Sequence, residues 1–163
     1  MVIKHYFFFV AIVFAFTTST QVLSQTPVRT MNGNAIELLD IINPKEPTIL
    51  IFSKLNDFLE MMGEIQTCYE HQLKPNDVQL IIILNDAVKW TEVKPCLFGR
   101  CCALEVFIDE NQYASRHFCI TTSLTLQTIW FNPFTQDSTR WCIQNSADLC
   151  LLYEQFSVII SKN

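Results

Sequence analysis

The densest group of residues that could do chemistry is a set of three cysteines, Cys96, Cys101 and Cys102. A thiolate attacks disulfides and binds soft metals such as copper or zinc, so this group is compatible with a redox pair or a soft-metal site. It is not a Cys-x-x-Cys motif, and no histidine is near it in the sequence. We therefore favour a structural disulfide plus a buried thiol over either chemistry.

The chain has seven cysteines in all. Because seven is an odd number, at least one thiol is unbonded, modified or joined to another chain. Two cysteines have a histidine nearby, Cys68 with His71 and Cys119 with His117. The first pair can share a helix face but lacks two further zinc ligands, and residues spaced like the second pair do not face each other on a helix. We expect packing roles for both pairs, with no metal and no cofactor.

Asp57 and Glu60 are the other side chains whose spacing could support chemistry. Two carboxylates can perform general acid–base catalysis, but neither a partnered histidine nor a defined pocket accompanies them. They stand at the predicted start of a helix, where Asp57 as N-cap and Glu60 as the third helical residue would form a carboxylate version of a capping box. Each such contact stabilises a helix by about 0.3–1 kcal/mol. We interpret the pair as helix-capping residues.

An alternating series of strands and helices is predicted to position these side chains. Two runs rich in β-branched residues, 48–52 and 78–84, are typical of strands buried on both faces. An amphipathic helix from about Asp57 to Leu73 separates them, which indicates a crossover between parallel strands. The other expected elements are an edge strand over 35–40, a helix over 86–98 interrupted at Pro95, a strand over 103–108, a helix over 113–118, strands over 124–131 and 140–143, and a terminal helix capped by Ser146.

Residues 1–24 are predicted to be a targeting signal and not part of the folded domain. A short basic region at Lys4 and His5 precedes an apolar run over 6–16. This run is shorter than the about 20 residues that span a bilayer, and it suits a signal peptide cleaved before Gln25. An uncleaved interfacial anchor is the alternative. After cleavage we expect the protein to have no stable membrane anchor. We also expect it to reside in an oxidising compartment.

The mature part would consist of an extended leader, 25–32, and one domain, 33–163. The formal net charge of the chain is −5, and no cluster of lysines and arginines occurs. This balance argues against nucleic acid and against anionic membrane surfaces as partners. The succession of elements predicts a single α/β domain with a mixed, mostly parallel sheet and helices on both faces.

Several short motifs have the place and order that they have in one known superfamily. They are Gly33-x-x-Ile36-x-Leu38, Lys45-x-Pro47 before the run 49–52, Val93-Lys94-Pro95, Gly99, Glu105-Val106-Phe107 and Asp109-Glu110-Asn111. On these residues the chain resembles the thioredoxin-like superfamily, especially its exported branch with TlpA- and ResA-like members. The resemblance covers nearly all of residues 33–161 and implies a thioredoxin-like α/β sandwich.

The residues that carry the family's chemistry are replaced in this sequence. In the family a Cys-x-x-Cys motif follows the central strand, and counting from Phe52 puts Asp57 and Glu60 at the two cysteine positions. The family's cis-proline corresponds to a position near Leu124, where this sequence has no proline. Because a carboxylate cannot form a mixed disulfide, the resemblance implies a degenerate site without the usual thiol–disulfide exchange.

By analogy with bacterial members of this branch we expect export, with the periplasm favoured over full secretion. The function we favour is non-catalytic binding of an unidentified protein or ligand through the cleft near Asp57 and the loop 122–125, so we do not expect an enzyme. One alternative is a thiol–disulfide oxidoreductase whose chemistry has moved to Cys96, Cys101 or Cys102. The other is a soft-metal-binding protein that uses the same three cysteines.

Overall fold

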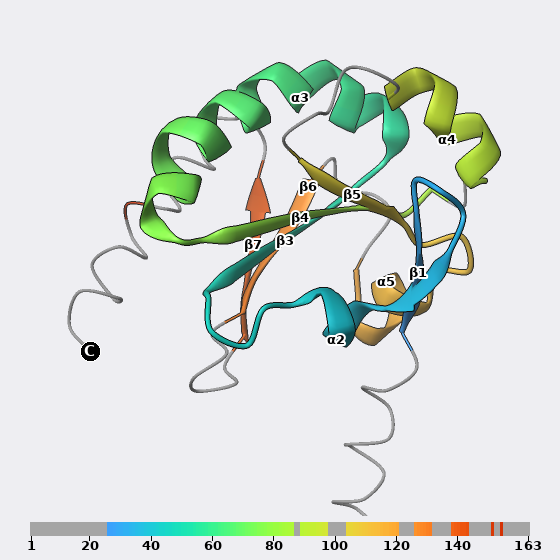
Figure 1. The fold of residues 1–163 in the computed structure, drawn as a ribbon, viewed down its shortest axis with the longest axis horizontal. Coiled ribbons are helices and arrows are strands. Elements are labelled where there is room, and N and C mark those ends of the chain that lie inside the picture. Colours follow the sequence, from blue (N-terminus) through green and yellow to red (C-terminus); the bar gives the residue numbers. More distant parts are fainter. Residues whose placement is uncertain are drawn as a thin grey trace, which may run out of the picture.

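The computed structural model of the chain describes residues 26–86, 89–97, 104–120, 126–131 and 138–143, together with Leu151 and Glu154. The strands are β1 (Pro27–Thr30), β2 (Ala35–Glu37), β3 (Thr48–Ser53), β4 (Gln79–Leu84), β5 (Glu105–Ile108), β6 (Leu126–Phe131) and β7 (Ser138–Ile143). The helices are α2 (Leu38–Ile41), α3 (Leu55–Cys68), its continuations η1 (Tyr69–Leu73) and η2 (Lys74–Asn76), α4 (Trp90–Leu97) and α5 (Tyr113–His117). The described strands form one seven-stranded sheet in the order β2-β1-β5-β4-β3-β6-β7 (Figure 1).

The two apolar runs predicted as buried strands form the centre of the sheet. β3 and β4 lie parallel, in continuous register from Thr48↔Gln79 to Ser53↔Leu84. Every residue of β3 is buried, and so is every residue of β4 except Gln79. Because α3 connects the two strands, the predicted crossover is confirmed. β5 continues the parallel part beside β4, and β6 lies antiparallel on the other side of β3.

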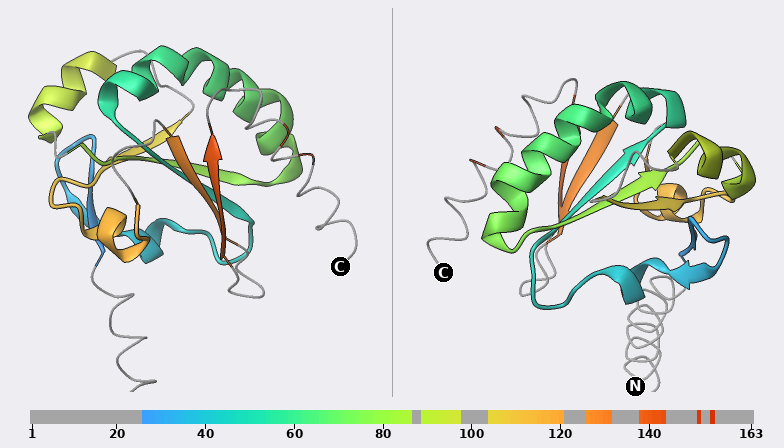
Figure 2. Two further views of the ribbon diagram at one scale, coloured as in Figure 1. Left: turned by 180° about the vertical axis from the view of Figure 1, so that it is seen from behind. Right: turned by 45° about the horizontal axis from the view of Figure 1, so that its top comes forward.

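Two apolar cores lie on opposite faces of the sheet. On one face, Phe58 of α3 and Val93 of α4 pack over strand residues such as Ile51. On the other face, Leu38 of α2 joins strand residues such as Leu50. Figure 2 shows α3 and α4 together on one side of the strands, and α2 and α5 together on the other. The predicted mixed sheet with helices on both faces is therefore confirmed, but the sheet is not mostly parallel. Among the described strands two pairings are parallel, β3 with β4 and β4 with β5, and four are antiparallel.

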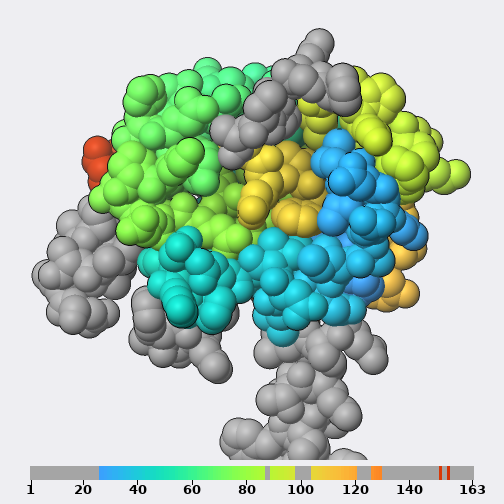
Figure 3. Space-filling view, in the orientation of Figure 1, coloured from blue at the N-terminus to red at the C-terminus, as the bar shows by residue number. Residues whose placement is uncertain are grey.

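The segment expected as an extended leader is extended, but it belongs to the sheet as β1. β1 forms a hairpin with β2 and pairs on its other side with β5, where Arg29 lies opposite Ile108. The hairpin lies beside α4 (Figure 3). At its tip, Gly33 lies against the indole ring of Trp90, since an added Cβ would be 2.9 Å from Cε2 of that ring. The strand expected over 35–40 is shorter than predicted, because its second half forms α2.

Two expectations about helices are corrected by the structure. α3 begins at Leu55, two residues before Asp57. α4 runs through Pro95 and is not interrupted there. Proline removes one backbone hydrogen bond from a helix interior, here the one to the carbonyl oxygen of Thr91, and the rest of α4 remains helical around that missing bond.

The last two strands confirm the antiparallel end of the predicted sheet. β6 pairs with β3 and with β7, and both pairings are antiparallel. Residues 126–129 of β6 are all buried, including the polar Gln127 and Thr128. β6 is an interior strand between β3 and β7, and its residues contribute to both cores, Leu126 to one and Ile129 to the other.

Two predicted segments fall outside the described residues. They are the signal peptide, 1–24, and most of the terminal helix expected after Ser146, of which Leu151 and Glu154 are described, helical and exposed. None of the helices in the described part of the chain is both long enough and apolar enough to cross a membrane.

Candidate functional site

The candidate site is the edge of the sheet at which the parallel strands β3, β4 and β5 end. α3 follows β3 directly, α4 follows β4 and α5 follows β5, so three helices begin at this edge. β6 also enters the sheet here, since Leu126 pairs with Ser53 at the end of β3. In open α/β sheets, ligands bind outside the carboxyl ends of the strands. This edge is therefore where the fold most readily places a binding surface.

Asp57 and Glu60 lie at the start of α3, but they do not cap it. The N-cap residue is Lys54, whose side chain makes no capping hydrogen bond, and Asp57 and Glu60 are the third and sixth residues of the helix. Asp57 is half-buried and Glu60 is exposed. The predicted capping box is therefore wrong. The helix can begin earlier because Leu55 packs against the core and receives its cap from another part of the chain.

That cap is Asp86, which stands two residues after β4. Its Oδ2 accepts a hydrogen bond of 3.0 Å from the backbone N–H of Leu55, the first residue of α3. The backbone N–H of Asn85 donates to the carbonyl oxygen of Ser53 at 2.9 Å, which extends the parallel pairing one step beyond the strands. The other carboxylate oxygen of Asp86, Oδ1, is buried and has no hydrogen-bond partner. The N-terminal end of α3 is thus joined to the end of β4 by a carboxylate.

Carboxylates also cap the other two helices of this edge. Glu110 accepts a hydrogen bond of 3.2 Å from the backbone N–H of Trp90, at the start of α4, and forms an ion pair of 2.6 Å with Arg29. Asp109 is fully buried, and its Oδ2 accepts from both the backbone N–H and the hydroxyl of Ser115, each at 2.7 Å. A helix N-terminus carries partial positive charge, and each of the three N-termini at this edge donates at least one backbone N–H to a carboxylate of the chain itself.

Asp109 and Glu110 belong to one of the motifs on which the resemblance rests, but neither they nor Asp86 were predicted to cap a helix. The sequence does contain a signal for them, because Asn85-Asp86 and Asp109-Glu110 each follow an apolar strand directly. Acidic residues at the carboxyl end of a parallel strand stand where helix N-termini gather, so this placement is the signal for a capping role.

The described cysteines do not lie in the first turns of α3. Cys68 is the last residue of that helix and is buried, and Cys119 lies just after α5 and is exposed. Cys96 is half-buried near the C-terminal end of α4, and its Sγ donates to the carbonyl oxygen of Glu92 at 3.5 Å. A thiolate is favoured at the N-terminal end of a helix, whereas Cys96 lies near the C-terminal end of α4. Outside the described residues lie Cys101, Cys102, Leu124 and the loop 122–125.

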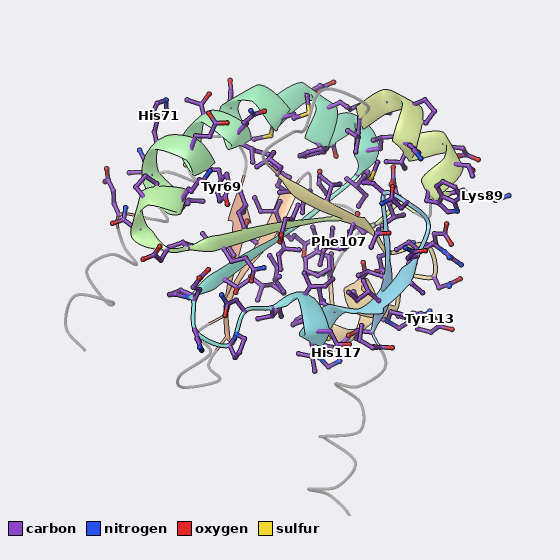
Figure 4. All side chains as sticks on the ribbon, in the orientation of Figure 1. Tyr69, His71, Lys89, Phe107, Tyr113 and His117 are labelled. Carbon is purple, nitrogen blue, oxygen red and sulfur yellow. The ribbon has the colours of Figure 1, made fainter. Side chains whose placement is uncertain are left out.

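The histidines of the two cysteine–histidine pairs, His71 and His117, lie on opposite sides of the sheet (Figure 4). Cys68 is buried, whereas His71 is exposed on η1 and points outward in Figure 4. His117 packs edge-on against the ring of Phe118, with 4.8 Å between the ring centroids, on the opposite side of the sheet. Within the described ranges, no three His, Cys, Asp or Glu side chains gather closely enough to hold a metal ion.

The sequence matches no protein-family model and no curated protein. Its structure is similar to that of a thioredoxin-like protein from Porphyromonas gingivalis, with a TM-score of 0.64 and 20% identity over 82% of this chain and 90% of the other. A secreted disulfide oxidoreductase of Mycobacterium tuberculosis, homologous to DsbE of E. coli, gives a TM-score of 0.62 at 8% identity, over 83% and 98%. The exposed lipoprotein thioredoxin Etrx1 of Streptococcus pneumoniae gives 0.61 at 9% identity, over 79% and 97%.

Proposed function

We propose that this chain, which has the thioredoxin-like fold, acts by binding a protein or ligand and does not carry out thiol–disulfide exchange at the start of α3. The observation that carries this proposal is the composition of that helix. Its first six residues, from Leu55 to Glu60, contain no cysteine, and its one cysteine, Cys68, is buried at the far end. Exchange requires a thiolate that can reach a disulfide. The first turn of α3 provides none.

The binding surface of this proposal is the first turn of α3 and the chain that leads into β6. Asn56 and Glu60 are exposed there, and Lys54 and Asp57 are half-buried beside them. These amide and charged groups can form hydrogen bonds with a partner without any covalent step. They require no metal and no cofactor.

We further propose that the chain is exported by a signal peptide over 1–24, with the periplasm as its destination. Two observations support this part of the proposal. The sequence begins with a short basic region and an apolar run of signal-peptide length. In addition, one similar structure belongs to a secreted protein and another to an exposed lipoprotein.

The second candidate is exchange chemistry that has moved to Cys96, Cys101 and Cys102. One observation favours it, since Cys96 is only half-buried on α4 and is therefore accessible to a reagent. A soft-metal site would use the same three residues.

The decisive measurement is the reduction of insulin by dithiothreitol in the presence of the purified protein, with a thioredoxin as positive control. We expect no acceleration over dithiothreitol alone. In a redox titration read by alkylation of each cysteine, we expect every bonded pair to resist reduction to below about −300 mV.

Clear turnover of insulin would refute the non-catalytic proposal. A pair that exchanges between about −120 and −270 mV would identify the relocated site. The triple variant C96S/C101S/C102S distinguishes the two sources of turnover, because it removes every thiol of the three-cysteine group and leaves the other four cysteines in place.

A further inference from the structure

The residue that caps α3 is Asp86, and the pairing of β3 with β4 fixes its position beside the start of the helix. β3 and β4 are parallel and in register to their last residues, Ser53 and Leu84. The chain leaves β3 into α3 after a single residue, Lys54, while Asp86 follows β4 by two residues. The hydrogen bond from the N–H of Leu55 to Asp86 Oδ2 is therefore a contact between two adjacent strand ends.

The N-terminus of a helix is the position at which a protein best stabilises an anion. The aligned peptide dipoles place roughly half a positive charge there, and the first N–H groups lack partners within the helix. A cysteine in such a place becomes a reactive thiolate because both effects favour its charged form. In this chain a full negative charge already accepts the first N–H of α3.

Among the described residues, no lysine, arginine or histidine forms an ion pair with Asp86. The ion pair in that part of the chain joins Arg29 to Glu110, and it does not involve Asp86. Oδ1 of Asp86 is buried without a hydrogen-bond partner, so the carboxylate is held through Oδ2 and the backbone of Leu55. The positive end of α3 is thus the group that the carboxylate faces.

We propose that Asp86 is a built-in anion that fills the thiolate-stabilising position of α3. This inference rests on the proposed function, and it adds a second barrier to exchange chemistry that is independent of the missing cysteines. A thiolate on the first turn would have to share the helix N-terminus with a like charge, and like charges disfavour each other's ionised form. Replacing Asp57 and Glu60 by cysteine is therefore not enough to restore a reactive thiol.

The test measures the reactivity of thiols placed on α3. The variant D57C/E60C is compared with D57C/E60C/D86N and D57C/E60C/D86A, and the pH dependence of alkylation gives the thiol pKa in each. We expect a pKa at or above the ordinary value of about 8.5 while Asp86 is present. We expect it to fall by about one unit in the D86A background, with alkylation at neutral pH about fivefold faster. In the D86N background the fall is smaller, because an amide oxygen can still accept the N–H of Leu55.

The matched control is E110Q in the D57C/E60C background. Glu110 is a carboxylate of the same edge that caps α4 and not α3, so its removal leaves the thiol pKa unchanged. Circular dichroism and thermal unfolding verify that each variant is folded. A depressed thiol pKa with Asp86 in place, or no change in pKa on its removal, would overturn the proposal.

A second measurement covers the case in which a cysteine variant does not fold. The protein with only D86N or D86A is titrated with sulfate, and the backbone amide resonances of Leu55 and Asn56 are followed. We expect sulfate to shift them in D86A but not in the unaltered protein, and equal shifts in both would overturn the proposal. The failure of this inference remains distinct from that of the proposed function, which the insulin assay tests on the unaltered chain.

Discussion

The hairpin between β1 and β2 depends on Gly33, because any other residue would be strained at this position. Its φ is +85°, a left-handed conformation that side chains rarely adopt, and an added Cβ would lie 2.9 Å from Cε2 of Trp90. We predict that Gly33→Ala lowers the free energy of unfolding by about 2 kcal/mol or more, through backbone strain and displacement of the indole. Urea denaturation measures the change.

A second glycine in the same chain provides the control. Gly63 lies on the exposed side of α3, and an added Cβ there meets nothing within 4 Å. Gly63→Ala is expected to raise the free energy of unfolding by about 0.5–1 kcal/mol, because alanine is the better helix former. Equal effects of the two substitutions would show that neither the turn nor the indole constrains Gly33.

Tyr69 gives the chain a pH dependence in alkaline solution. Burial raises the pKa of its phenol, and the carboxylates of Glu105 and Glu46 raise this pKa further. Below the unfolded value of about 10, both states keep the proton and the contribution of Tyr69 is complete. Above it the unfolded state loses the proton first, so the free energy of unfolding falls as the pH rises toward the folded pKa.

We predict that Tyr69→Phe removes part of this alkaline loss of stability. Urea unfolding at pH about 9 and about 11, on either side of the ordinary tyrosine pKa, measures the slope in each protein. Tyr113→Phe is the control, because Tyr113 is 45% exposed on α5. We expect Tyr113→Phe to keep the slope of the unaltered protein, and the prediction fails if Tyr69→Phe keeps it as well.

At the scale of the elements, α4 shows how a helix can continue through an unfavourable residue. Pro95 is exposed and lies inside α4, where it cannot donate to the carbonyl oxygen of Thr91. Proline in a helix interior is about 3 kcal/mol less favourable than alanine, and its stiffening of the unfolded chain offsets up to about 1 kcal/mol of this. We predict that Pro95→Ala raises the free energy of unfolding by about 1–2 kcal/mol, measured by urea denaturation.

Thr91→Ala is the matched control for this element, since Thr91 is exposed in the first turn of α4. Its effect is expected to remain within about 0.5 kcal/mol. A loss of stability in Pro95→Ala would mean that the proline is required by the loop on one side of the helix and is not merely tolerated within it.

The elements also show what local sequence can and cannot predict. β3 and β4 could be predicted because a short run of buried β-branched residues is a signal contained within the strand itself. The start of α3 could not, because its cap, Asp86, lies 31 residues further along the chain. The carboxylate nearest in sequence is Asp57, and a cap at that residue predicts a helix start two residues too late.

At the scale of the whole molecule, the central parallel part of the sheet follows from the order of apolar runs. The position of β1 does not, because a strand of four residues has too few alternations to be recognised and its partner β5 is far away in the sequence. For the candidate site, the resemblance indicated the start of α3, but it did not indicate that Asp86 caps this helix. The capping by Asp86 depends on β3 and β4 being neighbours in the sheet, so it can be predicted only once the order of the strands is known.

The pairing of β1 with β5 also sets the order in which the chain can fold as it is synthesised. β1 can pair with β5 only after Ile108, which lies opposite Arg29, has been synthesised. β3, α3 and β4 precede β5 in the chain and are synthesised before it. Until β5 has left the ribosome, β1 has only β2 as a neighbour, and an isolated two-stranded hairpin is marginally stable at best in water. The beginning of the chain therefore remains loosely held through most of translation. For the export proposed above, this delay means that the machinery would meet β1 before it is paired with the rest of the sheet.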